Sequence, residues 1–237
     1  MLEIRDLVKH YQVGDGEPIR ALDGASLSIA AGEFVALYGP SGSGKSTLID
    51  LIAGFQSPDR GVVLVDGSDI AQLSEPEHAE YLLKVIGIVG QPGDLLPGAL
   101  ARENAALKLL RTDPRHATRL IEPLLVALGL GERMTHPTNR LSMGERQRVM
   151  IAQALATQPK LLLADEPTGN LDTARGREVL GLLRDLCRER NTTVLLATHD
   201  PQAVSFADRA HELRDGRVRA HCPGEVDLHV RDALAQS

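Results

Sequence analysis

The sequence predicts an α/β fold with a mixed, mostly parallel sheet, an N-terminal antiparallel β layer and an inserted α-helical lobe. Short, nearly all-apolar runs at residues 34–38, 160–165 and 192–198 are typical of parallel strands that are covered on both faces. Residues 2–11 alternate between apolar and polar side chains, as a half-buried strand of a β layer does. Between residues 92 and 139, apolar residues recur mainly at helical spacing, which predicts the lobe.

The remaining elements are predicted from local signals. Ser142 and Glu145 form an S-x-x-E capping box, which places Ser142 at the N-cap of the helix that follows. For the other strands and helices, the spacing of apolar residues indicates the element, and glycine and proline indicate where it begins or ends. The predicted strands are residues 19–29, 61–67, 85–89 and a hairpin over 209–220 around Asp215-Gly216, and the predicted helices are residues 47–53 ending at Gly54, 74–83, 102–110, 116–128, 142–157, 174–190 and 203–207.

The composition is that of an ordinary globular chain. It has 237 residues, of which 43% are hydrophobic and 24% charged, enough to bury a sizeable core. A net charge of −6, only 3% aromatic residues and no Trp argue against nucleic-acid binding. The N-terminus carries scattered charges, and no stretch reaches the ~18 apolar residues of a membrane span, which predicts a cytoplasmic protein. Cys187 and Cys222 are predicted to be free thiols.

The most informative stretch is a glycine-rich turn between a predicted strand and a predicted helix. Its glycines let backbone N–H groups approach a phosphate, and the helix adds the positive end of its dipole. In the G-x-x-x-x-G-K-S pattern, Lys45 reaches the β- and γ-phosphates and the Ser46 hydroxyl holds Mg²⁺. A flexible Gly/Ser turn is the alternative, but the complete pattern favours a phosphate-binding loop. The loop consists of Gly39, Pro40, Ser41, Gly42, Ser43, Gly44, Lys45, Ser46 and Thr47.

Polar side chains also follow other predicted parallel strands, where ligands of open parallel sheets bind. Asp165 is placed to hold Mg²⁺ through its water shell, and Glu166 to contact an attacking water. Gln91 is placed to bind metal or water, and His199 to donate a hydrogen bond to a γ-phosphate. Each residue taken alone is more often a loop or structural residue than a functional one. Their joint occurrence after a complete phosphate loop favours the functional interpretation.

These motifs occur in an order that resembles the ATP-binding subunit of an ABC transporter. Within that family the chain is most similar to the lipoprotein-releasing, macrolide-export and cell-division branch, over residues 96–104 and 164–172. The resemblance covers about residues 2–220. It rests on the phosphate loop, Gln91, Leu141-Ser-Met-Gly-Glu145, residues 161–166, Asn170-Leu-Asp172 and His199.

The resemblance implies one ABC ATP-binding domain with a P-loop NTPase core, which hydrolyses ATP to ADP and phosphate with Mg²⁺. Lys45, Glu166 and His199 would act in catalysis, and Ser46, Gln91 and Asp165 would hold the metal. From its position alone, Tyr11 is expected to be exposed and is either an ordinary surface tyrosine or a stacking platform for adenine. The resemblance favours the stacking role.

The implied domain spans residues 1–237. Its nucleotide core with the β layer comprises about residues 1–90 and 158–220, its helical lobe with the signature about 91–157, and its C-terminal tail 221–237.

The resemblance also implies two kinds of partner. A second ATP-binding subunit, most simply another copy, would form a head-to-tail dimer in which Asp172 lies in the loop that crosses the interface. The signature of one copy would then act in trans at the γ-phosphate of the other. A membrane permease would contact residues 91–100 and the helical lobe, and would hold the chain at the cytoplasmic face of the membrane. The signature consists of Leu141, Ser142, Met143, Gly144 and Glu145.

Two departures from the family pattern and two alternatives accompany this interpretation. Met143 stands where the family usually has glycine, and Gly90 stands where an aromatic residue commonly precedes the glutamine. The first alternative is an ATPase of the cell-division type, which signals mechanically across a membrane without transport. The second is a soluble ABC ATPase acting on nucleic acid or ribosomes, against which the single domain and the net acidity argue.

Overall fold

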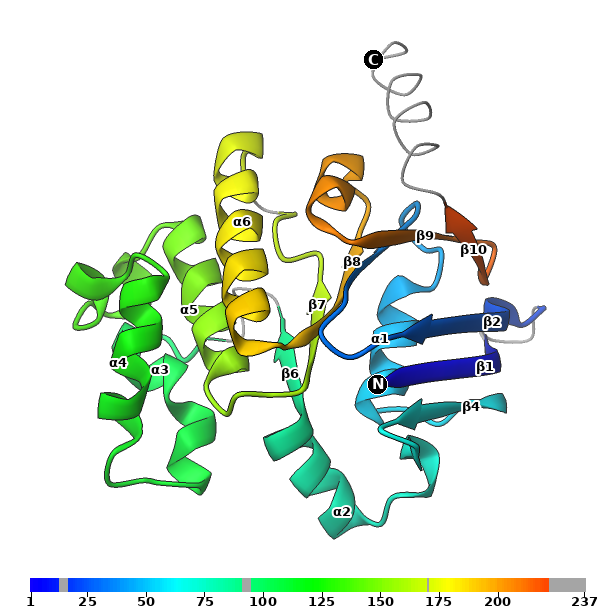
Figure 1. Cartoon of the computed structure of the whole chain (residues 1–237), viewed down its shortest axis with the longest axis horizontal. Coiled ribbons are helices and arrows are strands. Elements are labelled where there is room, and N and C mark those ends of the chain that lie inside the picture. The colour runs from blue at the N-terminus through cyan, green and yellow to red at the C-terminus, as the bar shows by residue number, and fades with distance from the viewer. Residues whose placement is uncertain (13–16, 91–94, 170, 222–237) are drawn as a thin grey trace. The chain divides into compact units, whose positions relative to one another are not determined.

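The computed structural model describes residues 1–12, 17–90, 95–169 and 171–221 (Figure 1). The chain forms two compact units, Met1–Glu80 with Thr193–Ser237, and Tyr81–Thr192. Both units combine β-strands with helices, and the sheets include parallel and antiparallel pairs, which confirms the predicted α/β class. The compact units divide the chain after residues 80 and 192, whereas the division predicted from the motifs lies at about residues 90 and 157.

The first unit contains an antiparallel layer in the strand order β2-β1-β4-β5. The alternation that predicts β1 is interrupted by a β-bulge between Ile4 and Leu7, where Asp6 takes a φ of 46°. The bulge keeps Leu2, Ile4 and Leu7 all buried. The strands of the layer are β1 (Leu2–Tyr11), β2 (Ile19–Ile29), β4 (Arg60–Val65) and β5 (Ser68–Asp69).

A second set of strands in this unit, ordered β10-β9-β3-β8, carries the strand that leads into the glycine-rich turn. β3 is parallel to both β8 and β9. All residues of β8 and four of the five residues of β3 are buried, as strands covered on both faces require. Asp215 and Gly216, with φ of 50° and 70°, form the predicted hairpin turn between β9 and β10. The strands are β3 (Phe34–Tyr38), β8 (Thr193–Thr198), β9 (Arg209–Arg214) and β10 (Arg217–His221).

Among its described residues, the first unit contains the α-helices α1 (Lys45–Ala53) and α2 (Glu75–Glu80). Gly54 ends α1 as predicted, with a φ of 74° and its N–H donating to helix carbonyls. A Cβ at Gly54 would lie 2.5 Å from His78 Nε2, so a larger residue there would displace the His78 side chain of α2. The predicted helix at residues 203–207 is instead a 3-10 helix, Pro201–Phe206.

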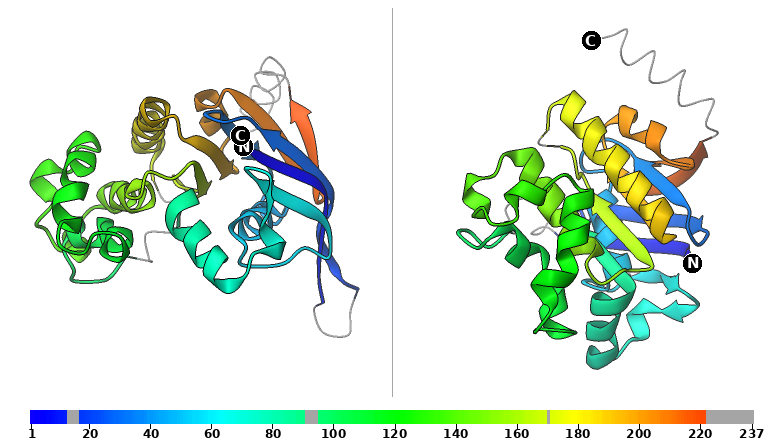
Figure 2. Two further views of the ribbon diagram at one scale, coloured as in Figure 1. Left: turned by 60° about the horizontal axis from the view of Figure 1, so that its bottom comes forward. Right: turned by 60° about the vertical axis from the view of Figure 1, so that its left-hand side comes forward.

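The second unit pairs β6 in parallel with β7 and surrounds the pair with helices. Figure 2 shows α3, α4 and α5 side by side, and α5 packs further against β6 and α6. Because α5 contacts so many elements, the residues that follow the signature form the centre of this unit. The elements are β6 (Ile86–Val89), β7 (Leu161–Asp165), α3 (Ala101–Ala105), α4 (Ala117–Ala127), α5 (Met143–Leu155) and α6 (Thr173–Arg190).

Two further predicted helices differ from a regular α-helix over part of their length. The helix predicted at residues 74–83 ends at Glu80, and Tyr81–Val85 continues as a π-helical turn in which Tyr81 is buried. The helix predicted at residues 102–110 gives way after α3 to a 3-10 helix, Leu107–Arg111. Lys108 joins the two regions, because its Nζ donates to Leu82 O (3.2 Å) and Ile86 O (3.1 Å). Burial lowers the pKa of this ammonium group.

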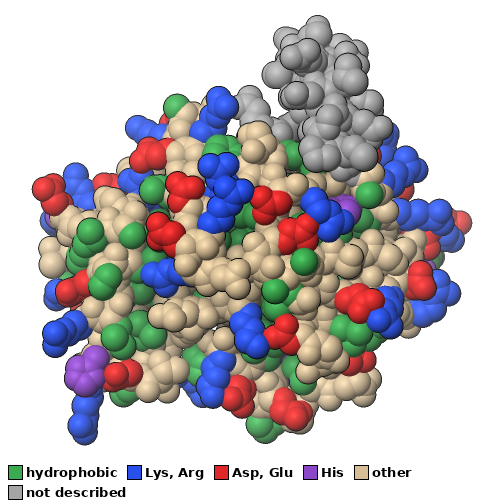
Figure 3. All heavy atoms as spheres, viewed as in Figure 1, with side chains coloured by type: hydrophobic (Ala, Val, Ile, Leu, Met, Phe, Trp, Pro, Cys, Tyr) green, Lys and Arg blue, Asp and Glu red, His purple; other side chains and the backbone are tan. Residues whose placement is uncertain are grey.

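Charged side chains of both signs are interspersed over the face that Figure 3 shows. The ion pairs among exposed side chains include Arg5 with Glu3 (2.6 Å) and Arg217 with Asp23 (3.0 Å). Solvent screens exposed pairs of this kind, so they contribute little to the free energy of unfolding. The stability of the first unit therefore depends mainly on its buried apolar strands.

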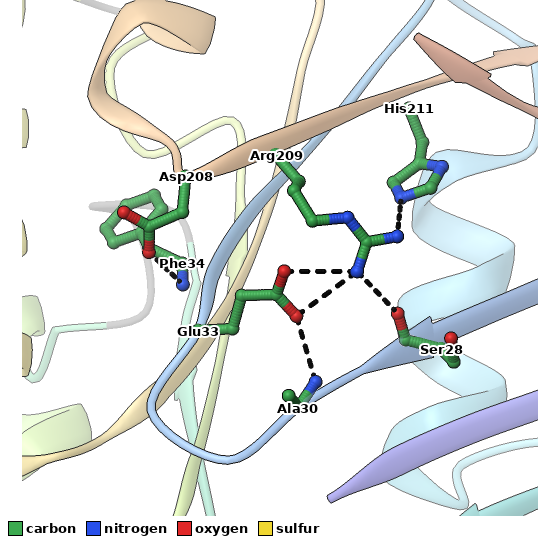
Figure 4. A network of polar contacts seen from close by, with 7 residues as sticks. All are labelled: Ser28, Ala30, Glu33, Phe34, Asp208, Arg209 and His211. Atoms are coloured by element: carbon green, nitrogen blue, oxygen red, sulfur yellow. Dashed lines mark hydrogen bonds and ion pairs between the residues drawn. The ribbon is translucent and has the colours of Figure 1, made fainter. Parts of the chain in front are cut away.

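A polar network fixes the start of β3 (Figure 4). The Phe34 N–H donates to Asp208 Oδ2 (2.9 Å), and the Asp208 N–H donates to Phe34 O (2.7 Å). Glu33 accepts hydrogen bonds from Arg209 Nη1 (3.0 Å) and from the Ala30 N–H (2.9 Å). These contacts hold the segment before β3 against the start of β9, and so set the register of the strand that leads to the glycine-rich turn.

Asp208→Ala is expected to lower the free energy of unfolding by about 1–3 kcal/mol, because the buried Phe34 N–H loses its acceptor. Thermal denaturation followed by circular dichroism measures the loss, because the melting temperature falls by about 2–4 °C per kcal/mol for a chain of this size. Asp208→Asn is the matched control, since its amide oxygen still accepts a hydrogen bond, and it should lose less. Equal losses in the two variants would contradict the explanation.

Candidate active site

The glycine-rich turn joins β3 to α1 within the first unit. Gly42 and Gly44 take positive φ values of 79° and 104°, which L side chains rarely adopt. A Cβ at Gly39 would lie 2.2 Å from Leu213 O, and a Cβ at Gly44 would lie 2.3 Å from Ala21 O. The neighbouring backbone of β9 and β2 therefore requires glycine at both positions.

Lys45, the first residue of α1, lies against this turn. It is only 6% exposed, and its Nζ donates to Gly39 O (2.8 Å) and Pro40 O (3.1 Å). The first turn of α1 contains no acidic residue, so the helix dipole and the ammonium group both present positive charge at this end. This arrangement favours an anion, and a phosphate group fits it.

A cavity of about 260 Å³ connects the turn with the antiparallel layer. Tyr11 and Ile19, which are register partners on β1 and β2, border it with an aromatic and an aliphatic side chain. A wall of this kind suits a nucleobase, whereas the turn suits the phosphates of the same nucleotide. The full lining is Tyr11, Ile19, Ala21, Gly42, Gly44, Lys45, Ser46 and Thr47.

Tyr11 is half-buried, so the expectation that it is exposed was wrong. Its hydroxyl donates to Gln56 Oε1 (2.7 Å), and Gln56 Nε2 donates to Asp50 Oδ2 on α1 (3.0 Å). Lys9 Nζ lies 5.7 Å from the centroid of the tyrosine ring, within cation–π range. The hydrogen bonds that run from Asp50 on α1 through Gln56 therefore orient the Tyr11 side chain at the border of the cavity. The alternation of residues 2–11 does not predict this contact, because Gln56 reaches the Tyr11 hydroxyl from the segment after α1.

His199 follows β8 in the same unit. Because Tyr38 and Thr198 are partners in the parallel β3–β8 pair, the residues after them, Gly39 and His199, begin side by side. The Gly39 N–H donates to Thr198 O (3.2 Å), which joins the phosphate-loop backbone to the end of β8. The predicted convergence of His199 and the glycine-rich turn is therefore present, and the His199 side chain is exposed.

Asp165 and Glu166 lie at the end of β7 in the second unit. Glu166 takes a φ of 47°, the left-handed conformation that is uncommon outside glycine, and its carbonyl accepts the Gly169 N–H (3.1 Å). Such conformations cost about 1–3 kcal/mol and cluster at functional sites. β6, the parallel partner of β7, leads toward Gln91, which itself lies outside the described residues.

The signature opens α5. Ser142 is the N-cap, its Oγ accepts the Glu145 N–H (3.3 Å), and its own N–H donates to Glu145 Oε2 (2.8 Å), so the predicted capping box is confirmed. Among the described residues, a Cβ at Gly144 would meet only Leu171 Cδ2, at 3.9 Å, which is ordinary van der Waals contact. Leu141 is buried, whereas Met143 is 40% exposed.

Two further residues complete the signature region. Arg133 Nε donates to Glu145 Oε1 (2.9 Å) from the end of the 3-10 helix Gly131–Arg133. No sequence motif pointed to Arg133. Asp172 is the N-cap of α6, and its Oδ1 accepts the Arg175 N–H (3.0 Å). That cap gives Asp172 a structural role, whatever it contacts outside the chain.

The chemistry of the described side chains suits a hard cation. The Ser46 hydroxyl, next to Lys45, and the Asp165 carboxylate are the oxygen ligands that Mg²⁺ prefers, and Mg²⁺ usually keeps several waters and binds to substrate phosphates. Within the described part of the chain, no three His, Cys, Asp or Glu residues form a metal-binding group.

In the part of the chain that the structure describes, no helix is long and apolar enough to cross a membrane.

Cys187, predicted to be a free thiol, is free and buried, and its burial raises the pKa of the thiol to about 12. Cys222 lies outside the described residues.

Comparison with known proteins identifies the family. The ABC transporter family model matches residues 22–169. The chain is 42% identical to the lipoprotein-releasing system ATP-binding protein LolD 2 of Chlorobaculum tepidum, over 94% of this chain and 93% of that protein. It is also 42% identical to the macrolide export ATP-binding/permease protein MacB of Rhodopirellula baltica, but spans only 35% of the length of that protein.

Solved structures agree. The dimeric structure of MJ0796, a bacterial ABC transporter cassette, superposes with a TM-score of 0.84 at 36% identity, over 92% of this chain and 97% of that one. A second dimeric structure of the same cassette is a post-hydrolysis state bound to ADP and Pi. The chain therefore belongs to the ABC transporter family, as an ATP-hydrolysing subunit of the branch that includes the lipoprotein-releasing and macrolide-export proteins.

Proposed function

We propose that this chain couples ATP hydrolysis to a membrane permease that releases lipoproteins from the membrane or exports a substrate across it. The observation that carries the proposal is the cavity that joins Tyr11 to a glycine-rich turn with a buried Lys45. Its two ends suit the base and the phosphates of ATP. Similarity to LolD and MacB proteins supports the choice of partner.

In the proposed reaction, residues of the first unit bind the nucleotide. Tyr11 stacks on the adenine, and the loop residues 39–47 surround the phosphates with backbone N–H groups. Lys45 exchanges its bonds to the loop carbonyls for bonds to the β- and γ-phosphates, which are charge-assisted and therefore stronger. His199 donates a hydrogen bond to the γ-phosphate from the end of β8.

Residues of the second unit supply the base and metal ligands. Glu166 accepts a proton from the attacking water, and its left-handed backbone conformation fixes the direction in which the carboxylate leaves the chain. Ser46 of the first unit, together with Asp165 and Gln91, would hold Mg²⁺. The metal, when bound, would neutralise charge on the phosphate oxygens.

The second partner in the proposal is another copy of this chain. In a head-to-tail dimer, the Ser142 hydroxyl and the Gly144 backbone of one copy face the γ-phosphate bound by the other. Ser142 Oγ accepts the Glu145 N–H, which leaves its own proton to donate to a phosphate oxygen. Glycine at residue 144, where a Cβ would meet only Leu171 Cδ2 among the described residues, lets a phosphate approach the backbone of α5 closely.

The turn at residues 96–100 suits contact with the permease. Leu96 is 50% exposed. Hydrogen bonds from buried side chains hold the backbone of Leu96 in place. Asn104 Oδ1 accepts the Leu96 N–H (2.7 Å), and Asn104 Nδ2 donates to Leu96 O (3.2 Å). Thr138 Oγ1 donates to the same carbonyl (2.9 Å). A rigid turn that presents an apolar side chain is suited to bind a partner. Binding there would hold the chain at the cytoplasmic face of the membrane.

Co-purification tests the partner. The full chain is tagged and recovered in detergent from its native membrane, and the recovered protein is assayed for ATP turnover with Mg²⁺. Recovery of a permease with a large extracytoplasmic domain supports release or export, whereas cell-division or wall-remodelling proteins favour mechanical signalling. Recovery with ribosomes or nucleic acid alone overturns the transport assignment. Absence of ATP turnover, both alone and with the permease, overturns the ATPase.

Leu96→Asp is expected to reduce the recovery of the permease at least about tenfold, because burying a leucine side chain contributes about 1.5–3 kcal/mol to binding. Quantitative immunoblotting of the co-purified permease measures this loss. Phe55→Asp, at a phenylalanine that is 56% exposed and lies outside residues 91–100 and the helical lobe, is the matched control and should retain the permease. If both variants retain it equally, the 96–100 turn is not a contact.

A further inference from the structure

We propose that Arg133 neutralises the carboxylate of Glu145 and thereby keeps the N-terminus of α5 able to receive a nucleotide phosphate. The inference rests on the proposed dimer, in which this end of α5 meets the γ-phosphate bound by the partner copy. It assigns Arg133 as a positioning residue that acts through Glu145 and does not itself touch the nucleotide.

The geometry fixes the Glu145 carboxylate in one orientation. Oε2 accepts the Ser142 N–H (2.8 Å) as part of the capping box, and Oε1 accepts Arg133 Nε (2.9 Å). The Glu145 side chain is 19% exposed and the Arg133 side chain 47% exposed, so the pair is partly shielded from solvent on the glutamate side. The carboxylate is therefore held within the first turn of α5, beside the Ser142 hydroxyl.

This position creates an electrostatic conflict. A helix N-terminus attracts anions, but a carboxylate in the same turn repels an approaching phosphate. The hydrogen bond from the Ser142 N–H, and then the hydrogen bond from Arg133, hold the pKa of Glu145 below its usual range, so the carboxylate is ionised at neutral pH. The negative charge is therefore permanent where the proposed site needs an anion to approach.

Arg133 is the residue placed to remove that conflict. Its guanidinium contacts the carboxylate oxygen that the capping box does not use. Arg146, the next basic residue along α5, instead donates through Nε to Thr138 O (2.9 Å) and through Nη2 to Asn139 O (3.1 Å). Arg133 thus converts a negatively charged cap into a nearly neutral one without breaking the bonds that start the helix.

The test distinguishes two possible roles of Arg133: neutralising the charge of Glu145, and only attaching the 3-10 helix Gly131–Arg133 to α5. In the Glu166→Gln background, where bound ATP is not consumed, ATP is titrated and the dimer of the full chain is measured by light scattering after size exclusion. We expect Arg133→Gln to raise the ATP concentration for half-maximal dimer formation about tenfold, and this increase to shrink as ionic strength rises. Arg133→Lys, which keeps the charge, should restore part of the affinity.

Glu145→Gln provides the decisive comparison, because it removes the negative charge and keeps the shape of the side chain. Adding Arg133→Gln to Glu145→Gln should change the half-maximal ATP concentration less than about threefold, since no charge remains to neutralise. Arg119→Gln, at an exposed arginine on α4, controls for the loss of one positive charge and should match the parent. Thermal denaturation of each variant monitors folding.

The opposing results are distinct. If Arg133→Gln weakens the dimer equally with and without Glu145→Gln, Arg133 acts as a structural attachment and the inference is wrong. An Arg133→Gln variant that matches the parent also overturns it. If the Glu166→Gln parent binds ATP but forms no dimer, the proposed dimer itself fails, and the inference fails with it.

Discussion

Glu166→Gln is expected to lower kcat for ATP hydrolysis by about 10²–10⁴-fold, the usual contribution of a general base, while ATP remains bound. The glutamine amide has nearly the shape of the carboxylate, but it cannot accept a proton from the attacking water. The unusual φ of 47° at this residue is set by the turn that follows β7, where Gly169 donates to Glu166 O, and glutamine preserves that bond. Steady-state release of phosphate and equilibrium binding of ATP measure the two properties separately.

Glu189→Gln, at an exposed glutamate near the end of α6, is the matched control for the loss of a carboxylate in the same unit. It should keep both turnover and binding. Retained turnover in Glu166→Gln would show that another group takes the proton. A Glu166→Gln variant that loses ATP instead would show that the carboxylate acts in binding, directly or through a metal, and would contradict its assignment as the base.

Local patterns predicted the backbone of this chain well. The glycine-rich turn depends on residues within one short stretch, and the S-x-x-E capping box depends on two residues of one helical turn, so each is encoded where it forms. Continuous apolar runs predicted β3 and β8 because the period and burial of a parallel strand are local properties. The convergence of Gly39 and His199 then follows, since parallel partners end at the same edge.

Side-chain partners that are distant in the sequence were not predictable in this way. Tyr11 was expected to be exposed because its strand alternates, but Gln56 folds onto its hydroxyl from a segment 45 residues further along. Arg133 reaches Glu145 from a 3-10 turn that no propensity signalled. In both cases the predicted strand or capping box is confirmed. The contact that orients the functional side chain depends on the tertiary fold, which brings a distant segment of the chain next to it.

Lys45→Met is the second large effect that we expect, and it concerns binding. The ammonium group is buried at the N-terminus of α1 and already makes two hydrogen bonds to loop carbonyls. Hydrogen bonds to a charged group each contribute about 1.5–3 kcal/mol, so loss of the contacts to the β- and γ-phosphates should raise the Kd for ATP by about 10²-fold or more. Methionine keeps an unbranched apolar side chain of similar length, so the packing of the stem is largely retained.

The measurement is isothermal titration calorimetry with ATP and Mg²⁺ in the Glu166→Gln background, where nucleotide is not consumed and binding is observed alone. Lys160→Met, at an exposed lysine, is the matched control and should bind as the parent does. Lys45→Arg should not rescue binding, because a planar guanidinium cannot reproduce the compact ammonium group that donates to Gly39 O and Pro40 O in the same turn. Unchanged affinity in Lys45→Met would mean that the ammonium only closes the loop on its own carbonyls, and the phosphates would then have to be held by the backbone N–H groups and the dipole of α1.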